Sequence, residues 1–230
     1  MVHTVVWRVE SDEALGFWAD RLAAEGVEAE RESDRLRFRD PEAMGLEVAV
    51  VETGDEPLVA EHPEIPQELA LQGFDGVRAY SARPDASRPL LEETLGFAPG
   101  GEDWEVRGEN RGSFYVYDEP PAERGTGGAG TVHHVAWAST MEDHEAWRER
   151  VLAAGMRPTP VIDRFYFRSV YFREPSGVLF EIATLGPGFT ADEPLETLGE
   201  ALSLPPAYEP LRERLEGVLT PLPDPRATAR

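Results

Sequence analysis

The chain has 230 residues, of which 44 are acidic and 22 are basic, so its formal net charge is −22 at pH 7. A chain of this length can bury a core as one large domain or two small ones, and its acidity argues against nucleic acid or an anionic membrane surface as a partner. It contains no cysteine, which excludes disulfides, thiolate metal sites and cysteine nucleophiles.

Residues 1–51, which we term module one, predict a strand, a helix and three further strands. Residues 2–7, V-H-T-V-V-W, are apolar and β-branched, as in a strand. Residues 17–27 have the spacing of apolar side chains that favours a helix, and they stop at a glycine. F-R-D-P at 38–41 is an acidic-Pro turn between two strands, and L-E-V-A-V at 46–50 is the closing strand.

The same order returns in residues 131–185, which we term module three. Its matching pieces are V-H-H-V-A-W, A-W-R-E-R-V-L-A-A-G-M, F-R-E-P and F-E-I-A-T, at 132–137, 146–156, 172–175 and 180–184. Residues 73–118, module two, are a weaker copy, with predicted strands at 74–80, 104–107 and 113–117 and a helix within 89–97. The chain therefore contains three copies of one βαβββ unit.

Three irregular segments separate and follow the repeats. Residues 52–72 are predicted as a linker, and residues 119–130, rich in Gly, are predicted as a more flexible one. Residues 186–230 are predicted as a Pro-rich tail with one helix near 207–219.

The repeat, with a His on its first strand and a Glu on its last, resembles the vicinal oxygen chelate superfamily. That superfamily includes glyoxalase I and extradiol ring-cleaving dioxygenases. Residues 131–215, with T-V-H-H-V-A-W and D-R-F-Y-F-R-S-V-Y-F-R-E-P-S-G-V-L-F-E-I-A-T, resemble ring-cleaving dioxygenases of the hydroquinone type almost continuously. The resemblance implies an α+β fold in which βαβββ modules pair into cupped mixed-sheet barrels, modules one and two sharing one barrel.

The resemblance is incomplete at its start. Members of this family have four modules, and the first of them, which begins with its own His-His strand, has no counterpart in this sequence. We therefore expect a chain that was cut at a module boundary by gene truncation or by a misplaced start.

Two residues of module three match metal ligands of the family, His134 and Glu181. Non-haem Fe(II) that activates O₂ is held by two His and one carboxylate, with open positions for substrate. Strand alternation places Glu181 opposite Phe180 and Ile182, and a carboxylate between two apolar residues needs a partner. A solvated Glu and a structural His are the alternative. The resemblance implies Fe(II), with Mn, Ni or Co possible, and a third ligand from elsewhere.

Modules one and two do not repeat this His-Glu pair. Glu47 stands at the position of Glu181, but Thr4 stands at the position of His134, so Glu47 is predicted to be a solvated or ion-paired carboxylate. His3, Thr4 and Glu47 of module one align in this order with His133, His134 and Glu181 of module three.

Three further residues are candidates for catalysis. His133 matches a family residue that moves protons near the substrate, although period-2 alternation would turn it away from its neighbour. Arg164 and Tyr171 lie in an insertion and match substrate-pocket positions, where they would stabilise a phenolate. A buried structural His, a surface Arg and a packed Tyr are the alternatives. His62 and His144 are predicted to be structural or solvated.

The resemblance implies an Fe(II)-dependent, extradiol-type ring-cleaving dioxygenase that acts on hydroquinone- or catechol-like aromatics and O₂. Two other functions stay open. A metal-dependent lyase or isomerase of the glyoxalase type could form by dimerisation, and a barrel without a full metal set could bind an aromatic ligand without catalysis.

The absent module also bears on assembly. Modules one and two can pair with each other, which leaves module three as half a barrel with an open sheet edge. Such an edge is an association site, and a twofold homodimer is the commonest closed solution. The alternative is that a separate chain or an upstream segment supplies the missing His.

The sequence contains no candidate membrane span. No apolar run reaches the roughly 18 residues that a helix needs to cross a bilayer, and the first residues lack the pattern of a signal peptide. We therefore expect a soluble, cytoplasmic protein.

The excess of negative charge predicts a dependence on salt. All 22 basic residues are arginine, and the composition resembles that of proteins from salt-loving archaea; a merely acidic mesophilic protein is the alternative. Because salt screens repulsion between surface carboxylates, we expect the melting temperature to rise between low salt and molar KCl. Thermal denaturation followed by circular dichroism measures this, and a flat or falling melting temperature contradicts it.

Overall fold

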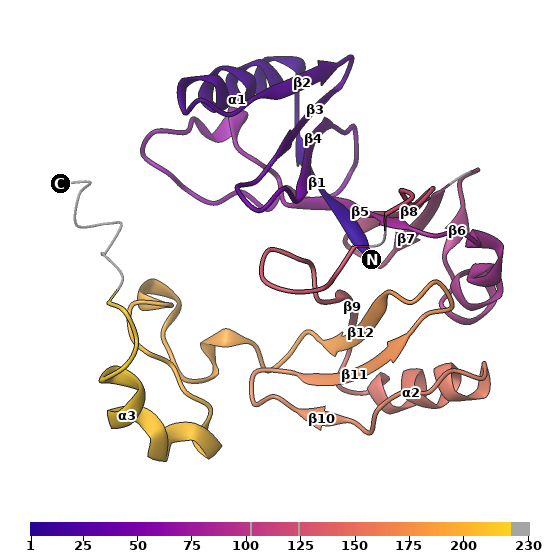
Figure 1. Cartoon of the computed structure of the whole chain (residues 1–230). Coiled ribbons are helices and arrows are strands. Elements are labelled where there is room, and N and C mark those ends of the chain that lie inside the picture. The colour runs from indigo at the N-terminus through magenta and orange to yellow at the C-terminus, as the bar shows by residue number, and fades with distance from the viewer. Residues whose placement is uncertain (102, 124, 222–230) are drawn as a thin grey trace. The chain divides into compact units, whose positions relative to one another are not determined.

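A computed structural model describes residues 1–101, 103–123 and 125–221. The chain divides into two compact units (Figure 1). The first contains Met1–Val135 together with Arg173–Leu179, and the second contains Ala136–Phe172 and the chain from Phe180 onwards. Each unit is described by itself.

Modules one and two form one eight-stranded mixed sheet in the order β2-β3-β4-β1-β5-β8-β7-β6. Its strands are β1 (Val2–Val9), β2 (Ala29–Glu32), β3 (Arg35–Arg39), β4 (Gly45–Val50), β5 (Phe74–Tyr80), β6 (Ala98–Pro99), β7 (Asp103–Arg107) and β8 (Gly112–Asp118). Within each module the first strand is parallel to the last, β1 to β4 and β5 to β8. The two first strands, β1 and β5, pair antiparallel and join the modules.

The predicted mixed sheet is confirmed, but its predicted closure into a barrel is wrong. β2 and β6 stand at opposite ends of the strand order, so within the described residues the sheet is open. β6 is two residues long and ends at Pro99, and a strand this short, with no N–H at its last residue, offers little for a closing ladder.

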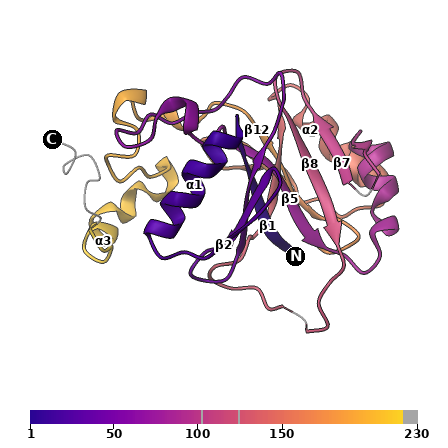
Figure 2. The ribbon, with the colours of Figure 1, turned by 90° about the horizontal axis from the view of Figure 1, so that it is seen from above.

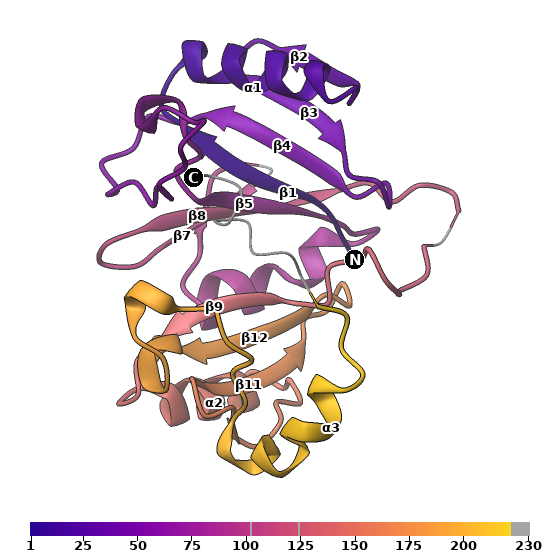
Figure 3. The ribbon, with the colours of Figure 1, turned by 90° about the vertical axis from the view of Figure 1, so that its left-hand side faces the viewer.

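Helix α1 (Asp12–Ala24) packs beside the strands of module one, as Figures 2 and 3 show. It begins at Ser11, whose side chain accepts a hydrogen bond from the backbone N–H of Ala14, which stabilises the helix start. Leu15 is fully buried. The core of this module consists of Val9, Ala14, Leu15, Leu36 and Val48, with Trp18 and Leu22 packed against it.

The two acidic-Pro turns are confirmed, and they share one hydrogen-bonding pattern. Asp40 and Glu174 each accept hydrogen bonds from the backbone N–H groups two and four residues further on, at 2.8–3.0 Å. Glu174, 2% exposed, also accepts from the hydroxyls of Ser87 and Tyr117 at 2.5 and 2.6 Å. The same local chemistry therefore forms the turn in modules one and three.

The first predicted linker is anchored in the fold by a buried carboxylate. Asp55, whose side chain is 4% exposed, accepts hydrogen bonds from Arg8 and Arg107 at 2.6 Å and from the Gly112 N–H at 3.0 Å. Arg8, also 4% exposed, binds Asp75 at 2.6 Å as well. A one-turn 3₁₀ helix (Gln67–Leu69) follows. The linker is thus part of the first unit.

Module two has a shorter helix than predicted. A 3₁₀ turn (Pro84–Ala86) leads into a single turn of π-helix (Leu90–Thr94), and Leu90 and Leu91 are buried. Gly96 then takes a φ of +76°, a conformation that L side chains rarely adopt.

Module three has the strand order β10-β11-β12-β9, the same order as β2-β3-β4-β1. Its elements are β9 (Val135–Ser139), α2 (His144–Ala153), β10 (Ile162–Asp163), β11 (Arg168–Arg173) and β12 (Leu179–Thr184). The first strand begins at Val135, three residues later than predicted. In α2, Val151 is buried whereas Leu152 is 51% exposed.

The tail contains several short helices. They are 3₁₀ turns at Phe189–Ala191, Leu195–Thr197 and Pro206–Leu211, followed by α3 (Arg212–Glu216). The helix predicted near 207–219 is thus split between two elements, and residues 222–230 of the predicted tail lie outside the described residues. No helix within the described ranges is both long and apolar enough to cross a membrane.

Candidate functional site

His133 and His134 lie in the first unit, in an irregular segment directly before β9. Their Nδ1 atoms are 2.9 Å apart and their rings meet edge to face at 5.2 Å. A hydrogen bond between two imidazole nitrogens needs one N–H and one lone pair, so one ring donates and the other accepts. Both rings line a cavity of about 800 Å³ that Tyr80 and Arg173 also line.

This placement corrects the sequence prediction for the two histidines. Period-2 alternation would have turned them to opposite faces of a strand. Because the strand begins only at Val135, the alternation does not apply, and the two side chains contact each other.

Glu181 lies in the second unit on β12 and is 3% exposed. Phe180 and Ile182 are also buried, and Phe180 contacts Phe172 with ring centroids 5.9 Å apart, so they pack in the apolar core as the alternation predicts. The Ser169 hydroxyl, on the neighbouring strand β11, donates a short hydrogen bond to Oε1 of Glu181. The buried carboxylate therefore has the polar partner that its burial requires.

Tyr171 and Arg164 extend this cluster. Tyr171 follows Ser169 by two residues on β11, and its hydroxyl makes a long, 3.5 Å contact with the Ser169 hydroxyl. The Arg164 guanidinium lies 5.6 Å from the centre of the Tyr171 ring, a cation–π contact. Arg164 sits in the turn between β10 and β11, where its backbone N–H donates to the Phe167 carbonyl at 2.9 Å.

The structure thus brings the predicted residues together in two groups. His133 contacts His134 in the first unit, whereas Arg164, Tyr171 and Glu181 belong to one cluster in the second unit. Sequence reasoning missed Ser169, which links Tyr171 to Glu181. The available signal was its position two residues before Tyr171, on the same face of the strand. In the described parts of the chain, no three His, Asp or Glu side chains form a group that could hold a metal ion.

The remaining histidines divide into one exposed and one buried residue. His62 is exposed in the first predicted linker and accepts from the Glu64 N–H at 3.2 Å. His144 is 2% exposed, and its Nδ1 lies 2.8 Å from the Ser139 hydroxyl. Burial lowers the pKa of His144, so the ring is neutral near pH 7. His144 is the first residue of α2 and packs against Ser139 at the end of β9. This contact buries the ring although its neighbours in sequence are mostly acidic and polar.

Glu47 of module one is ion-paired, as one of the two predicted alternatives has it. The carboxylate is fully buried, with one oxygen bound by Arg35 and the other by Arg37, the latter at 2.9 Å. The hydrogen bond and charge of Glu47 raise the pKa of Arg37. At the position that aligns with Glu181, module one therefore presents a neutralised carboxylate.

Comparison with known proteins places these features in a family. Residues 73–182 match the model of the Glyoxalase/Bleomycin resistance protein/Dioxygenase superfamily. The chain is 40% identical to MhqO of Bacillus subtilis, named as a candidate ring-cleaving dioxygenase, over 90% of this chain and 69% of that protein. It is 29% identical to the chlorohydroquinone/hydroquinone 1,2-dioxygenase of Sphingobium indicum, over 87% of this chain and 67% of that protein.

A solved structure supports the same relationship. The crystal structure of a candidate dioxygenase from Bacillus subtilis superposes with a TM-score of 0.87 at 35% identity, and the match covers 97% of this chain and 74% of that one. Identity at this level over most of both chains shows common descent as well as a common fold. The chain belongs to the Glyoxalase/Bleomycin resistance protein/Dioxygenase superfamily.

Proposed function

We propose that the chain is a metal-dependent, extradiol-type ring-cleaving dioxygenase that acts on hydroquinone- or catechol-like aromatics with O₂. The observation that carries this proposal is the cluster of Arg164, Tyr171, Ser169 and Glu181. It combines a cation, a phenol and a buried carboxylate in a chain whose relatives are named as ring-cleaving dioxygenases.

The chemistry of the donors suits a divalent metal. An imidazole nitrogen from His134 and a carboxylate oxygen from Glu181 are donors that Fe(II), Mn, Ni and Co accept. The hydrogen bond from Ser169 orients the Glu181 carboxylate, as outer partners of metal ligands commonly do. When bound, the metal, for which we propose Fe(II), would polarise the substrate and provide a position for O₂.

The other side chains would bind the substrate and move protons. Arg164 can stabilise the negative charge of a phenolate through charge-assisted hydrogen bonds. Tyr171 can donate a hydrogen bond to the same oxygen. His133 shares a hydrogen bond with His134, and an imidazole can accept a phenol proton near pH 7.

Substitution of Arg164 and of Tyr171 should separate substrate chemistry from metal binding. We expect Arg164→Ala and Tyr171→Phe each to lower kcat/KM by roughly 10²-fold or more, the scale of a lost proton donor, with metal content unchanged. Steady-state O₂ uptake and metal analysis measure the two effects.

Matched controls are available in the same unit. Tyr166→Phe removes a hydroxyl bound to Asp192 and Ser203, and Arg157→Ala removes an exposed cation; both should retain activity. Loss of metal in the Arg164 or Tyr171 variant would reassign that residue to folding or to ligation.

We further propose that a homodimer completes the metal site. In the eight-stranded sheet the first strands β1 and β5 pair with each other, whereas β9, the first strand of module three, stands last in its sheet order. An edge strand of this kind pairs readily with another strand, and twofold symmetry would place two copies of module three together. Two copies of His134 and Glu181 could then hold one metal, a set that resembles glyoxalase I.

This proposal makes a stoichiometric prediction. We expect one metal per two chains, lost together with the dimer in His134→Ala, because a metal held by His134 and Glu181 of both copies would join them. Light scattering and metal analysis at high salt measure both quantities. A monomer that binds no metal after reconstitution contradicts the dimer and favours a protein that binds aromatics without catalysis. A monomer that binds one metal per chain would point to a different third donor.

One comparison of activities tests the proposed reaction. Metal-reconstituted protein is assayed for O₂ consumption on hydroquinone and catechol and, in parallel, for turnover of the methylglyoxal–thiol adduct. Ring cleavage predicts O₂ consumption with loss of the aromatic absorbance. Turnover of the thiol adduct alone would support the glyoxalase-type alternative, which the ligand set of two His and two Glu favours.

A further inference from the structure

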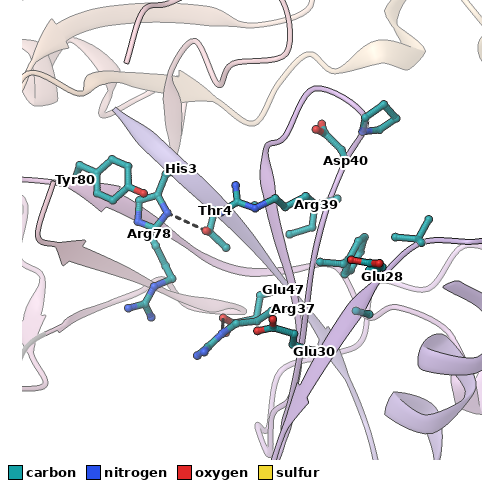
Figure 4. Close-up of a pocket in the computed structure, with 16 residues that line it drawn as sticks. His3, Thr4, Glu28, Glu30, Arg37, Arg39, Asp40, Glu47, Arg78 and Tyr80 are labelled. Atoms are coloured by element: carbon teal, nitrogen blue, oxygen red, sulfur yellow. Dashed lines mark hydrogen bonds and ion pairs between the residues drawn. The ribbon is translucent and has the colours of Figure 1, made fainter. Parts of the chain in front are cut away.

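We propose that the first unit contains a second ligand site, which binds a neutral aromatic ring bearing two or more hydroxyl groups. The site is a cavity of about 850 Å³, bounded by residues of strands β1 to β5 (Figure 4). The proposal does not depend on the ring-cleaving reaction, because its residues belong to modules one and two.

The cavity is built for an organic ligand rather than for a metal ion. Its buried carboxylate, Glu47, is bound through both oxygens by Arg35 and Arg37. Both nitrogens of His3 are also engaged, Nε2 with Asp118 and Nδ1 with the neighbouring Thr4, each at 2.9 Å. Glu47, which aligns with the proposed ligand Glu181, and His3, which aligns with His133, are therefore both bound to other groups.

The chain of contacts from Asp118 to Thr4 fixes the direction of each hydrogen bond. Asp118 is held as a carboxylate by Arg78, at 2.8 and 2.5 Å, and a carboxylate only accepts. Nε2 of His3 must therefore donate to Asp118. Burial lowers the pKa of His3, so the ring is neutral and its Nδ1 accepts from the Thr4 hydroxyl. The Thr4 oxygen then keeps its lone pairs for a ligand that donates.

A flat platform lies beside this acceptor. The rings of His3 and Tyr80 are stacked with centroids 3.9 Å apart and an angle of 14° between their planes. Figure 4 shows the stacked pair next to Thr4. Phe38 and Leu46 add apolar surface to the lining. An aromatic ligand can therefore pack its ring against the stacked pair while its hydroxyl donates a hydrogen bond to the Thr4 oxygen.

The opposite wall is also rich in acceptors. Glu28 and Glu30 are exposed carboxylates that line the cavity and pair with no other described residue. Three arginines, Arg37, Arg39 and Arg78, also line the cavity. Arg37 is bound to Glu47, Arg78 is bound to Asp118, and NH1 of Arg39 donates to the Ala43 carbonyl at 2.8 Å. Because these arginines already bind other groups, Glu28 and Glu30 leave the cavity with an excess of acceptors, which favours ligands with O–H donors over anions. A ring with two hydroxyls could donate one hydrogen bond to the Thr4 oxygen and one to the carboxylate of Glu28 or Glu30.

Binding of hydroquinone to the metal-free full-length chain tests the proposal. Calorimetric titration under argon prevents turnover, and chelation removes the metal that the proposed ring-cleaving site requires. We expect one hydroquinone per chain, retained in Glu181→Gln, and binding at least 5-fold weaker for 1,4-dimethoxybenzene, which has no donor, and for benzoate, which is an anion.

Two substitutions locate the site. Thr4→Val keeps the shape of the side chain but removes the acceptor, and Tyr80→Ala removes half of the stacked platform; each should weaken binding about 5- to 10-fold. Thr4→Ser and Tyr80→Phe, which keep the hydroxyl and the ring, should bind as the original protein does. If metal-free protein binds no hydroquinone, or if Thr4→Val and Tyr80→Phe behave alike, the proposal is overturned. These outcomes leave the ring-cleaving proposal untouched.

Discussion

Replacement of Glu181 by Gln is expected to lower kcat for ring cleavage on the order of 10³-fold or more. Loss of a metal that stabilises charge in the transition state removes several kcal/mol, and each 1.4 kcal/mol is roughly tenfold in rate. The Gln side chain has the same shape and still offers a carbonyl oxygen to the Ser169 hydroxyl, so the fold should persist. O₂ uptake, metal content and the melting temperature measure the three effects.

Ser169→Ala should cause a smaller loss of activity than Glu181→Gln. Ser169 is fully buried and donates to the Glu181 carboxylate, and loss of such an outer partner typically costs about 10- to 100-fold in metal affinity or activity. Glu196→Gln, an exposed carboxylate in the tail, is the control and should be unchanged. Full activity in Glu181→Gln would show that the carboxylate is not a ligand, whatever the reaction proves to be.

The largest effect on stability is expected from Asp55→Ala. This carboxylate is buried and bound by Arg8, Arg107 and the Gly112 N–H. The substitution leaves the buried Arg8 with Asp75 as its remaining carboxylate partner, and breaking a buried ion pair typically costs about 3–5 kcal/mol. Urea denaturation measures the change in the free energy of unfolding. Asp12→Ala, which removes a carboxylate that is 81% exposed and pairs with Arg31, should cost less than about 1 kcal/mol.

The same carboxylate predicts a dependence on pH. The hydrogen bond from Arg107, followed by those from the Gly112 N–H and Arg8, holds the pKa of Asp55 well below its usual range. Its contribution is therefore complete above the unfolded-state pKa of about 3.9 and is lost as the pH falls towards the lower pKa of the folded state. The free energy of unfolding should fall less steeply below about pH 4 in Asp55→Ala than in the original protein. If the free energies of unfolding of the two proteins fall in parallel below about pH 4, the pKa of Asp55 is not lowered by folding.

Local sequence patterns determined the order of the elements and two of the turns. The βαβββ order of modules one and three follows from hydrophobic periods of two and of 3.6, which depend only on residues near one another in the chain. The acidic-Pro turns follow from side chains that accept hydrogen bonds two and four residues further on. The burial of Phe180 and Ile182 follows from alternation on a single strand.

The candidate site residues came from the resemblance to the family and not from periodicity. His134, Glu181, Arg164 and Tyr171 are candidates because they match positions of the family in motifs that can be seen in the sequence. Ser169 has no motif of its own, and its role appears only when β11 lies beside β12. Hydrogen bonds between strands depend on register, which the sequence of one strand does not specify.

Only the tertiary structure decided the features that depend on contacts between distant residues. Asp55 anchors a segment that looked like a linker because Arg8 and Arg107, which hold it, are 47 and 52 residues away. The open ends of the eight-stranded sheet likewise depend on how distant strands pair. The contacts of His144 with Ser139 and of His133 with His134 join residues close in sequence, but they depend on where β9 begins and ends, which the residue pattern did not indicate. Composition and periodicity indicate which secondary structure each segment favours by itself. The pairing of segments that are distant in the sequence decides which strands form, where they begin and which side chains they bury.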